Sequence, residues 1–211
     1  MTTKHSRTPG RPRQFDPEQA IETAQHLFHS HGYDAVSVAD LTKAFGINPP
    51  SFYAAFGSKL GLYTRVLKRY RMTDAIPLGA LLRHDRPTAK CLIDMLMEAA
   101  RRYVADPDAT GCLVLEGAHC NDKPAREAAC EFYIAAENLI RTYVAMRYPQ
   151  EADRMTDFMG TLMAGLSARA GLSAKASRAG LSAKARAGYS LERLQESVLL
   201  AGDVLERLLP D

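Results

Sequence analysis

The sequence has no apolar run that approaches the roughly 20 residues needed to cross a bilayer. The first sixteen residues also lack the apolar stretch of a secretory signal; they read MTTKHSRTPGRPRQFD. We therefore expect a cytoplasmic protein. Runs of alternating β-branched residues are absent as well, whereas helical spacing of apolar residues dominates, so the fold class is predicted to be all-α.

Cysteine is scarce, and no two cysteines form a CxxC pair, which argues against a zinc site or a thioredoxin-like motif. In a cytoplasmic protein, thiols are expected to stay reduced. We accordingly predict no metal and no cofactor. The four cysteines fall in the C-terminal two-thirds of the chain: Cys91, Cys112, Cys120 and Cys130.

The net charge of +3 is modest, but it is unevenly distributed. Residues 1–75 carry ten Lys/Arg and six Asp/Glu, a balance of +4, and the remaining 136 residues carry 17 and 18, a balance of −1. We predict that residues 1–14 are a flexible basic arm. This distribution indicates a polyanion contact at the N-terminal end. The alternative is a solvated tail.

Capping residues mark out the helices of a first domain, residues 15–75. Asp16 is a suitable N-cap, and Gly32 supplies a left-handed C-terminus for the first helix. Ser37 begins a short second helix, which Gly46 ends. Asn48 then caps a third helix, whose first turn tolerates two prolines because its N–H groups have no helical partner.

Residues 37–56 therefore have the arrangement of a helix-turn-helix, in which the second helix, 49–56, enters the major groove of DNA. Small exposed side chains would let this helix approach base edges closely. The alternative is an ordinary helical hairpin. The exposed candidates are Asn48, Pro50, Ser51, Ala54 and Ala55.

Residues 76–211 form a second unit with short loops, as expected for a larger helical bundle. A short segment, GLSAR at 165–169, recurs as GLSAK at 171–175 and at 180–184. The spacing is irregular, so we interpret the repeat as a local duplication or a sequence error. The added residues are expected either to lengthen a helix or to bulge outward. The predicted helices are 87–105, 111–121, 124–147, 150–168 and 190–209.

Over about residues 10–70 the sequence resembles the N-terminal domain of the TetR/AcrR family of regulators. The resemblance depends on four elements in the right order: HGYDAVSV, LTKAFGI, SFYAAF and SKLGL. It implies an all-α homodimer with a DNA-binding domain and a larger ligand-binding and dimerisation domain. It also implies a repressor of transcription that a small-molecule effector releases from a palindromic operator, and not an enzyme.

The resemblance assigns DNA contacts to particular residues. Tyr53 and Lys59 correspond to phosphate contacts, and Ser37 to a further backbone contact. Arg11 and Arg13 correspond to an arm that reaches the adjacent groove. The alternatives are that Tyr53 belongs to the core, that Lys59 is a solvated surface residue, and that the arm binds nonspecifically.

Two features depart from the family pattern. Pro50 stands where Gly or Ala is common, and Ala54 and Ala55 replace larger polar or aromatic residues. These departures leave the base preference open but do not affect the predicted fold.

Apolar and aromatic residues of the second unit suggest an effector pocket, because such side chains suit apolar ligands. The alternative is that these residues belong to the hydrophobic core, since core residues of a helix have the same spacing. The candidate lining residues are Met95, Tyr103, Cys112, Phe132, Tyr133, Phe158 and Met163.

The phrase TGCLVLEGAHC at 110–120 resembles an element that carries a responsive cysteine in a subset of the family. Cys112 is thus a candidate reactive thiol, with Cys120 as a partner about two turns away on one helix, ~12 Å, too far for a direct disulfide. Small buried hydrophobes are the favoured alternative. A thiol enzyme with His119 as base is a further alternative that lacks an orienting acid.

We expect homodimerisation through the last two helices, 150–168 and 190–209, because two heads spaced by about one turn of DNA gain affinity and register. The alternatives are that the apolar stripe packs within one protomer, and that the protein binds nucleic acid nonspecifically without an effector. The stripe comprises Leu191, Leu194, Val198, Leu199, Leu205 and Leu208.

Overall fold

The computed structural model describes residues 15–178 and 190–210, and of residues 173–178 it describes only the backbone. Within these ranges every regular element is a helix, which confirms the all-α prediction. The elements are α1 (Pro17–His31), α2 (Val38–Phe45), α3 (Pro49–Phe56), α4 (Lys59–Thr73), α5 (Leu78–Leu81), α6 (Thr88–Tyr103), α7 (Leu113–Gly117), α8 (Lys123–Ala145), α9 (Ala152–Arg178) and α11 (Leu191–Leu208).

Helices α1 to α4, here called the head, begin at the predicted caps. The Asp16 side chain accepts a hydrogen bond from the Glu18 N–H at 3.0 Å. Ser37 and Asp40 form a capping box at the start of α2, each side chain bonding the other residue's backbone N–H. Gly46 ends α2 with a φ of 68°, in the left-handed region that glycine adopts without steric cost.

The core of the head is not closed on itself. Phe28, Phe52 and Tyr63 pack in one cluster that also includes Leu113 and Ala129, from α7 and α8. The head therefore depends on the bundle (α5 to α11) for part of its apolar burial. A second cluster, built mainly from α6, α8, α9 and α11, forms the core of the bundle.

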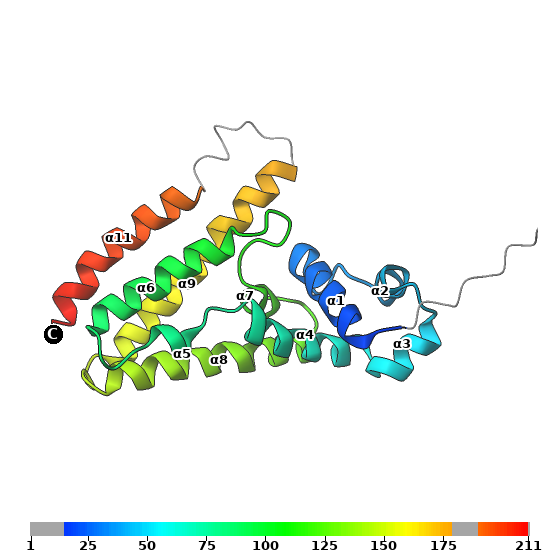
Figure 1. Ribbon diagram of the computed structural model, residues 1–211, viewed down its shortest axis with the longest axis horizontal. Helices are drawn as coiled ribbons and strands as arrows, with labels where there is room; N and C mark the ends of the chain where they lie inside the picture. The colour runs from blue at the N-terminus through cyan, green and yellow to red at the C-terminus, as the bar shows by residue number, and fades with distance from the viewer. Residues whose placement is uncertain (1–14, 179–189, 211) are drawn as a thin grey trace, which may run out of the picture.

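The molecule is elongated, with α3 at one end of the long axis and α11 toward the other (Figure 1). Helix α8 packs against α4, α7 and α9, so it joins the head to the bundle. Helix α11 packs mainly on α6. This arrangement leaves α2 and α3 free of the bundle.

Two predicted helices of the bundle differ from the structure, and one short helix was not predicted. The helix expected over 111–121 is only α7, because Gly111 has a φ of 84° and Cys112 is extended. The helix expected over 150–168 is α9, which continues to Arg178 and includes the first two GLSA copies. The third copy, 180–184, lies outside the described residues. The short α5 was not predicted.

Candidate nucleic-acid interface

The predicted helix-turn-helix is formed by α2, the turn at Gly46, and α3. Leu41 and Phe52 are fully buried and hold the two helices together. The rings of Phe45 and Phe52 stack with centroids 6.5 Å apart, and Phe52 also lies 5.4 Å from Phe56. This apolar base makes α3 a rigid element although it has only eight residues.

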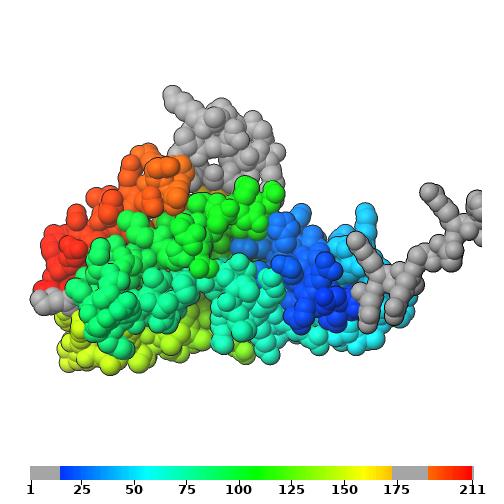
Figure 2. Space-filling model, viewed as in Figure 1, coloured from blue at the N-terminus to red at the C-terminus, as the bar shows by residue number. Residues whose placement is uncertain are grey.

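The opposite face of α3 is open to solvent. Pro50, Ser51, Tyr53 and Ala54 are all exposed. Asn48 caps the helix, and its side chain accepts a hydrogen bond from the Ser51 N–H at 2.9 Å. Ala55, expected to be exposed, is half-buried against the core of the head. Space-filling side chains of the bundle do not cover this end of the molecule in the view of Figure 2.

Tyr53 is an exposed residue and not part of the core. Its side chain is 51% exposed, and its ring meets the edge of Phe52 at a centroid distance of 5.4 Å. The contact with Phe52 orients the ring, while the phenol hydroxyl remains free to reach a polar group outside the protein. This position suits the phosphate contact that the sequence predicts.

Lys59 begins α4, and its ammonium group lies over the ring of Tyr33, 3.9 Å from the centroid. Partial burial lowers the pKa of Lys59, and the nearby carboxylates of Asp34 and Asp122 act in the opposite direction. The amine is thus held by a cation–π contact at the surface. A phosphate that approached the N-terminus of α4 would compete with Tyr33 for it.

The remaining candidate DNA contacts are less defined. The Ser37 hydroxyl is used within the capping box: it donates to the Asp40 carboxylate at 2.6 Å and accepts from the Asp40 N–H at 3.1 Å. These bonds lower the pKa of Asp40. Arg11 and Arg13 lie outside the described residues. Their roles stay predictions.

Comparison with known proteins identifies the family. Residues 20–66 match the model of the bacterial regulatory proteins of the tetR family. The HTH-type transcriptional repressor BdcR of Escherichia coli (strain K12) is 51% identical over 211 residues, which is 100% of both chains. The chain belongs to the TetR family. The repressor ComR of the same organism is 28% identical over 213 residues, 96% of this chain and 92% of its own.

A solved TetR-family structure resembles the whole fold. It is a cysteine mutant of the regulator CifR in complex with 26-bp double-strand operator DNA, and it is 28% identical, with a TM-score of 0.75. The match covers 92% of this chain and 98% of that one. The similarity therefore extends through the bundle and is not limited to the head.

The bundle of this TetR-family chain contains an apolar cavity of about 480 Å³ between α4, α5, α6, α7, α8 and α9. Five of the seven predicted lining residues reach it: Tyr103, Cys112, Phe132, Tyr133 and Met163. Two predictions were wrong. Met95 is fully buried in the core, and Phe158 packs against the same core, so both serve packing and neither lines the cavity.

Several lining residues were missed by the sequence analysis. Tyr70, Ile76, Leu78, Leu139 and Ile140 line the cavity, and they come from α4, the segment up to α5, and α8. The first three lie near the domain boundary, where the break at Pro77 concealed a wall of the cavity. Ile76 and Leu78, the apolar residues on either side of Pro77, were the sequence signal that could have indicated this wall of the cavity.

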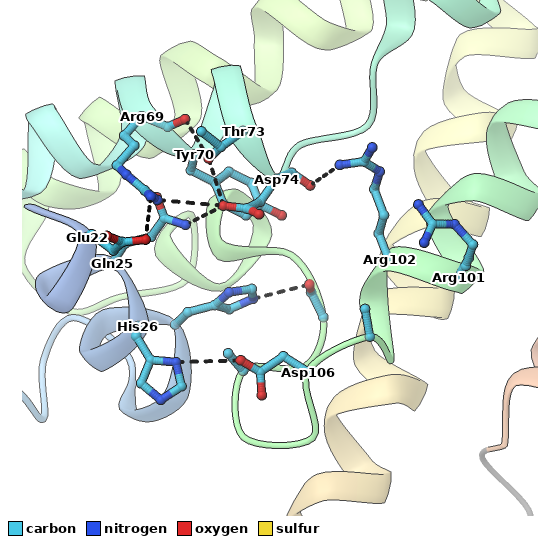
Figure 3. Close-up of a pocket in the computed structure, with 14 residues that line it drawn as sticks. Glu22, Gln25, His26, Arg69, Tyr70, Thr73, Asp74, Arg101, Arg102 and Asp106 are labelled. Atoms are coloured by element: carbon cyan, nitrogen blue, oxygen red, sulfur yellow. Dashed lines mark hydrogen bonds and ion pairs between the residues drawn. The ribbon is translucent and has the colours of Figure 1, made fainter.

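A second cavity, of about 440 Å³ and polar, lies where the head meets the bundle (Figure 3). Gln25 donates to Asp74 at 2.6 Å and accepts from Arg69 at 2.9 Å. Arg102 of α6 donates to the carbonyl of Asp74 at 3.1 Å. These bonds connect α1 and α4 of the head to α6, the first long helix of the bundle.

Tyr70 lines both cavities. Its hydroxyl donates to the Cys112 thiol at 3.7 Å, and its ring meets the edge of the His29 ring at 5.7 Å. Nε2 of His29 in turn lies 3.2 Å from the carbonyl oxygen of Gly111. Tyr70 and His29 thus link the apolar cavity to α1.

The cysteines are free thiols in the structure. Cys112 precedes α7 and Cys120 follows it, so the two do not share a helix as the sequence analysis assumed. The Cys120 thiol lies 3.4 Å from the carbonyl oxygen of Asp122. His119 uses Nδ1 on the Leu115 carbonyl at 2.8 Å, so this ring nitrogen is engaged away from the Cys112 thiol.

The apolar stripe of α11 divides between two environments. Leu194, Val198 and Leu205 are buried against the bundle, as the alternative of packing within one protomer predicts. Leu199 of the stripe, by contrast, is 58% exposed, and its neighbour Leu200, which was not part of the predicted stripe, is 72% exposed. Among the described helices, none is both long and apolar enough to span a membrane.

Proposed function

We propose that this TetR-family regulator represses transcription by binding a partly palindromic operator as a homodimer. Residues 15–75 bind DNA, with 37–56 as the helix-turn-helix and 49–56 as its recognition helix. Residues 76–211 bind an effector and dimerise. The observation that supports the proposal best is the open face of α3, held on the buried Phe52 and flanked by the exposed Tyr53.

Small side chains on that face are suited to close approach. Ala54 presents a methyl group that can contact a thymine methyl, and Ser51 presents a hydroxyl that can pair with several bases. Tyr53 and Lys59 bind backbone phosphate, with Lys59 leaving Tyr33 for the anion. The operator complex of CifR supports this assignment by similarity of fold.

A homodimer provides the two heads that such an operator requires. The exposed pair Leu199 and Leu200 lies on α11, which is on the opposite side of the molecule from α3 (Figure 1), so a twofold contact there leaves both heads free. We assign the interface to α9 and α11. The effector occupies the apolar cavity of the bundle, and the links through Tyr70 and Asp74 carry its effect to the head.

We assign no catalytic activity to the chain. A thiol enzyme would need a base on Cys112, and the polar groups described beside that thiol are the phenols of Tyr70 and Tyr103. Turnover that disappears in Cys112→Ala would contradict this assignment.

Affinity for DNA tests the proposal directly. Fluorescence anisotropy compares the duplex beside the protein's own coding region with a scrambled duplex of the same composition, at several salt concentrations. We expect a preference of about 10³-fold or more for the natural duplex, with strong salt dependence. Equal affinity for both duplexes would instead support nonspecific nucleic-acid binding.

Sedimentation tests the interface. Leu199→Glu combined with Leu200→Glu should convert the dimer to a monomer and lower operator affinity. Met146→Glu, at a 64% exposed residue directly after α8, is the matched control and should leave the dimer intact. A dimer that survives the α11 double variant would contradict the proposed interface.

A further inference from the structure

Tyr103 carries a buried hydroxyl that has no hydrogen-bond partner of adequate geometry in the described residues. The side chain is only 1% exposed, at the end of α6. An unpaired hydroxyl costs free energy when it is removed from water, so folded proteins retain few of them without a reason. Tyr63 has a second such hydroxyl, but it lies against Gly117 and Ala129 and not in a cavity.

The surroundings of Tyr103 offer its hydroxyl no strong hydrogen-bond acceptor. It lines the apolar cavity together with Tyr70 and Cys112. The thiol of Cys112 is a weak acceptor and already receives the hydroxyl of Tyr70 at 3.7 Å. Burial raises the pKa values of Tyr70 and Tyr103 well above the ordinary value, so both phenols stay protonated at neutral pH. Tyr103 is therefore a neutral donor whose one neighbouring acceptor is the weak Cys112 thiol, which Tyr70 already occupies.

The rest of the cavity wall disfavours a charged ligand. Arg71 is exposed and lies over the ring of Phe132 at 5.9 Å, and Glu137 is hydrogen-bonded to Tyr133. Neither charge is among the groups that act on Tyr103. An ionised group placed beside Tyr103 would be buried without a counter-charge, which is costly. The apolar lining includes Ile76, Leu78, Phe132, Leu139, Ile140 and Met163.

We propose that the cavity binds an uncharged, mainly apolar molecule whose single hydrogen-bond acceptor, a carbonyl or ether oxygen, receives the hydroxyl of Tyr103. The apolar body of the ligand lies against the side chains of α5 and α8. The volume of about 480 Å³ is within the range of small-molecule sites. This inference rests on the proposed effector role of the cavity and names the chemical class of the effector.

A pair of probes that differ in one carbonyl tests the inference. Benzophenone and diphenylmethane have nearly the same shape, and only the first carries an acceptor. Calorimetric titration of the DNA-free dimer should show benzophenone binding about 10-fold more tightly, the effect of one hydrogen bond to a buried donor. Diphenylacetate, a charged analogue, should bind more weakly than benzophenone.

Two variants show whether Tyr103 provides the discrimination. In Tyr103→Phe the ratio of the two affinities should fall to about 1, because the donor is gone. Tyr133→Phe is the matched control: it removes a hydroxyl from the same cavity that already binds Glu137, and the ratio should persist. The melting temperature of Tyr103→Phe should equal or exceed that of the wild type, since an unpaired hydroxyl is lost.

Three results would overturn the inference: equal binding of the two neutral probes by the wild type, a ratio that survives in Tyr103→Phe, or binding of diphenylacetate as tight as that of benzophenone. Undetectable binding of all three probes would overturn it as well. Because the titration contains no DNA, its failure is distinct from failure of the proposed function. The latter appears as a loss of operator preference in the anisotropy experiment.

Discussion

Gly117 lies against the hydroxyl of Tyr63 so closely that a Cβ at this position would overlap the hydroxyl oxygen and would also meet the Cβ of Ala129 at 2.9 Å. Gly117 belongs to α7 and Tyr63 to α4, so this contact sets how closely the bundle approaches the head. The Tyr63 ring is fully buried and cannot easily move aside.

Gly117→Ala should therefore lower the free energy of unfolding by about 1–3 kcal/mol, the usual cost of overpacking a well-packed core. Tyr63→Phe removes the overlapping oxygen, and in the Gly117→Ala background it should recover part of that loss. Denaturant unfolding of the two single variants and the double variant gives the coupling. Gly171→Ala, whose added Cβ meets nothing within 4 Å, is the control. Additive effects would mean that the two residues do not interact.

Lys59→Ala should weaken binding to every duplex alike, because a phosphate contact carries no sequence information. The slope of log affinity against log salt should become shallower by about 0.9, the value expected for one phosphate contact. Anisotropy at several salt concentrations measures both. Lys68→Ala removes an exposed lysine farther along α4 and should leave the slope unchanged. A loss confined to one base position would assign Lys59 to base recognition.

Ala54→Leu should alter the preferred operator while stability stays within about 0.5 kcal/mol, since the position is exposed. Selection of bound fragments from random duplexes reports the preference. Phe52→Ala, on the buried face of the same helix, should instead cost about 3–5 kcal/mol of stability and abolish DNA binding. An unchanged operator in Ala54→Leu would show that this face does not contact the bases.

Acid should destabilise the head through His29. Burial lowers the pKa of His29, while the contact with the Gly111 carbonyl and nearby carboxylates oppose the change. The folded state therefore binds the proton less readily than the unfolded chain, and stability present above about pH 6.5 is lost as pH falls below it. Unfolding between about pH 7.5 and 5 should be less pH-dependent in His29→Gln than in the wild type.

His119→Gln replaces an exposed histidine and serves as the control. Its pH dependence should match that of the wild type. If His29→Gln and His119→Gln behaved alike, the burial of His29 would not contribute to acid sensitivity.

The head could be predicted from the sequence because its signals are local. Asp16, Ser37 and Asn48 each cap a helix, and the structure places all three where the sequence indicates. A cap depends on residues within one turn, so no knowledge of distant packing is needed. The open face of α3 followed from the same boundaries.

The bundle could be predicted only in part because its details depend on distant contacts. Gly111 interrupts the expected helix where its backbone passes Ser167, whose hydroxyl accepts from the Cys112 N–H at 2.9 Å. From helical spacing, Met95 and Tyr103 were both predicted to line the cavity. Only the rotation of α6 against its neighbours decides which of them reaches it. That rotation is a tertiary property.

Tyr70 lies near the C-terminal end of α4, beside the apolar cavity, whereas Lys59 is at the N-terminal end of the same helix. Lys59 and Tyr70 are eleven residues apart on this helix, about 16 Å along its axis, so a tilt of about 5° about Tyr70 would move Lys59 by about 1.4 Å. A displacement of that size separates a good phosphate contact from a poor one. If the proposed effector pressed on the Tyr70 ring from the apolar cavity, it would act on the far end of α4 without touching it.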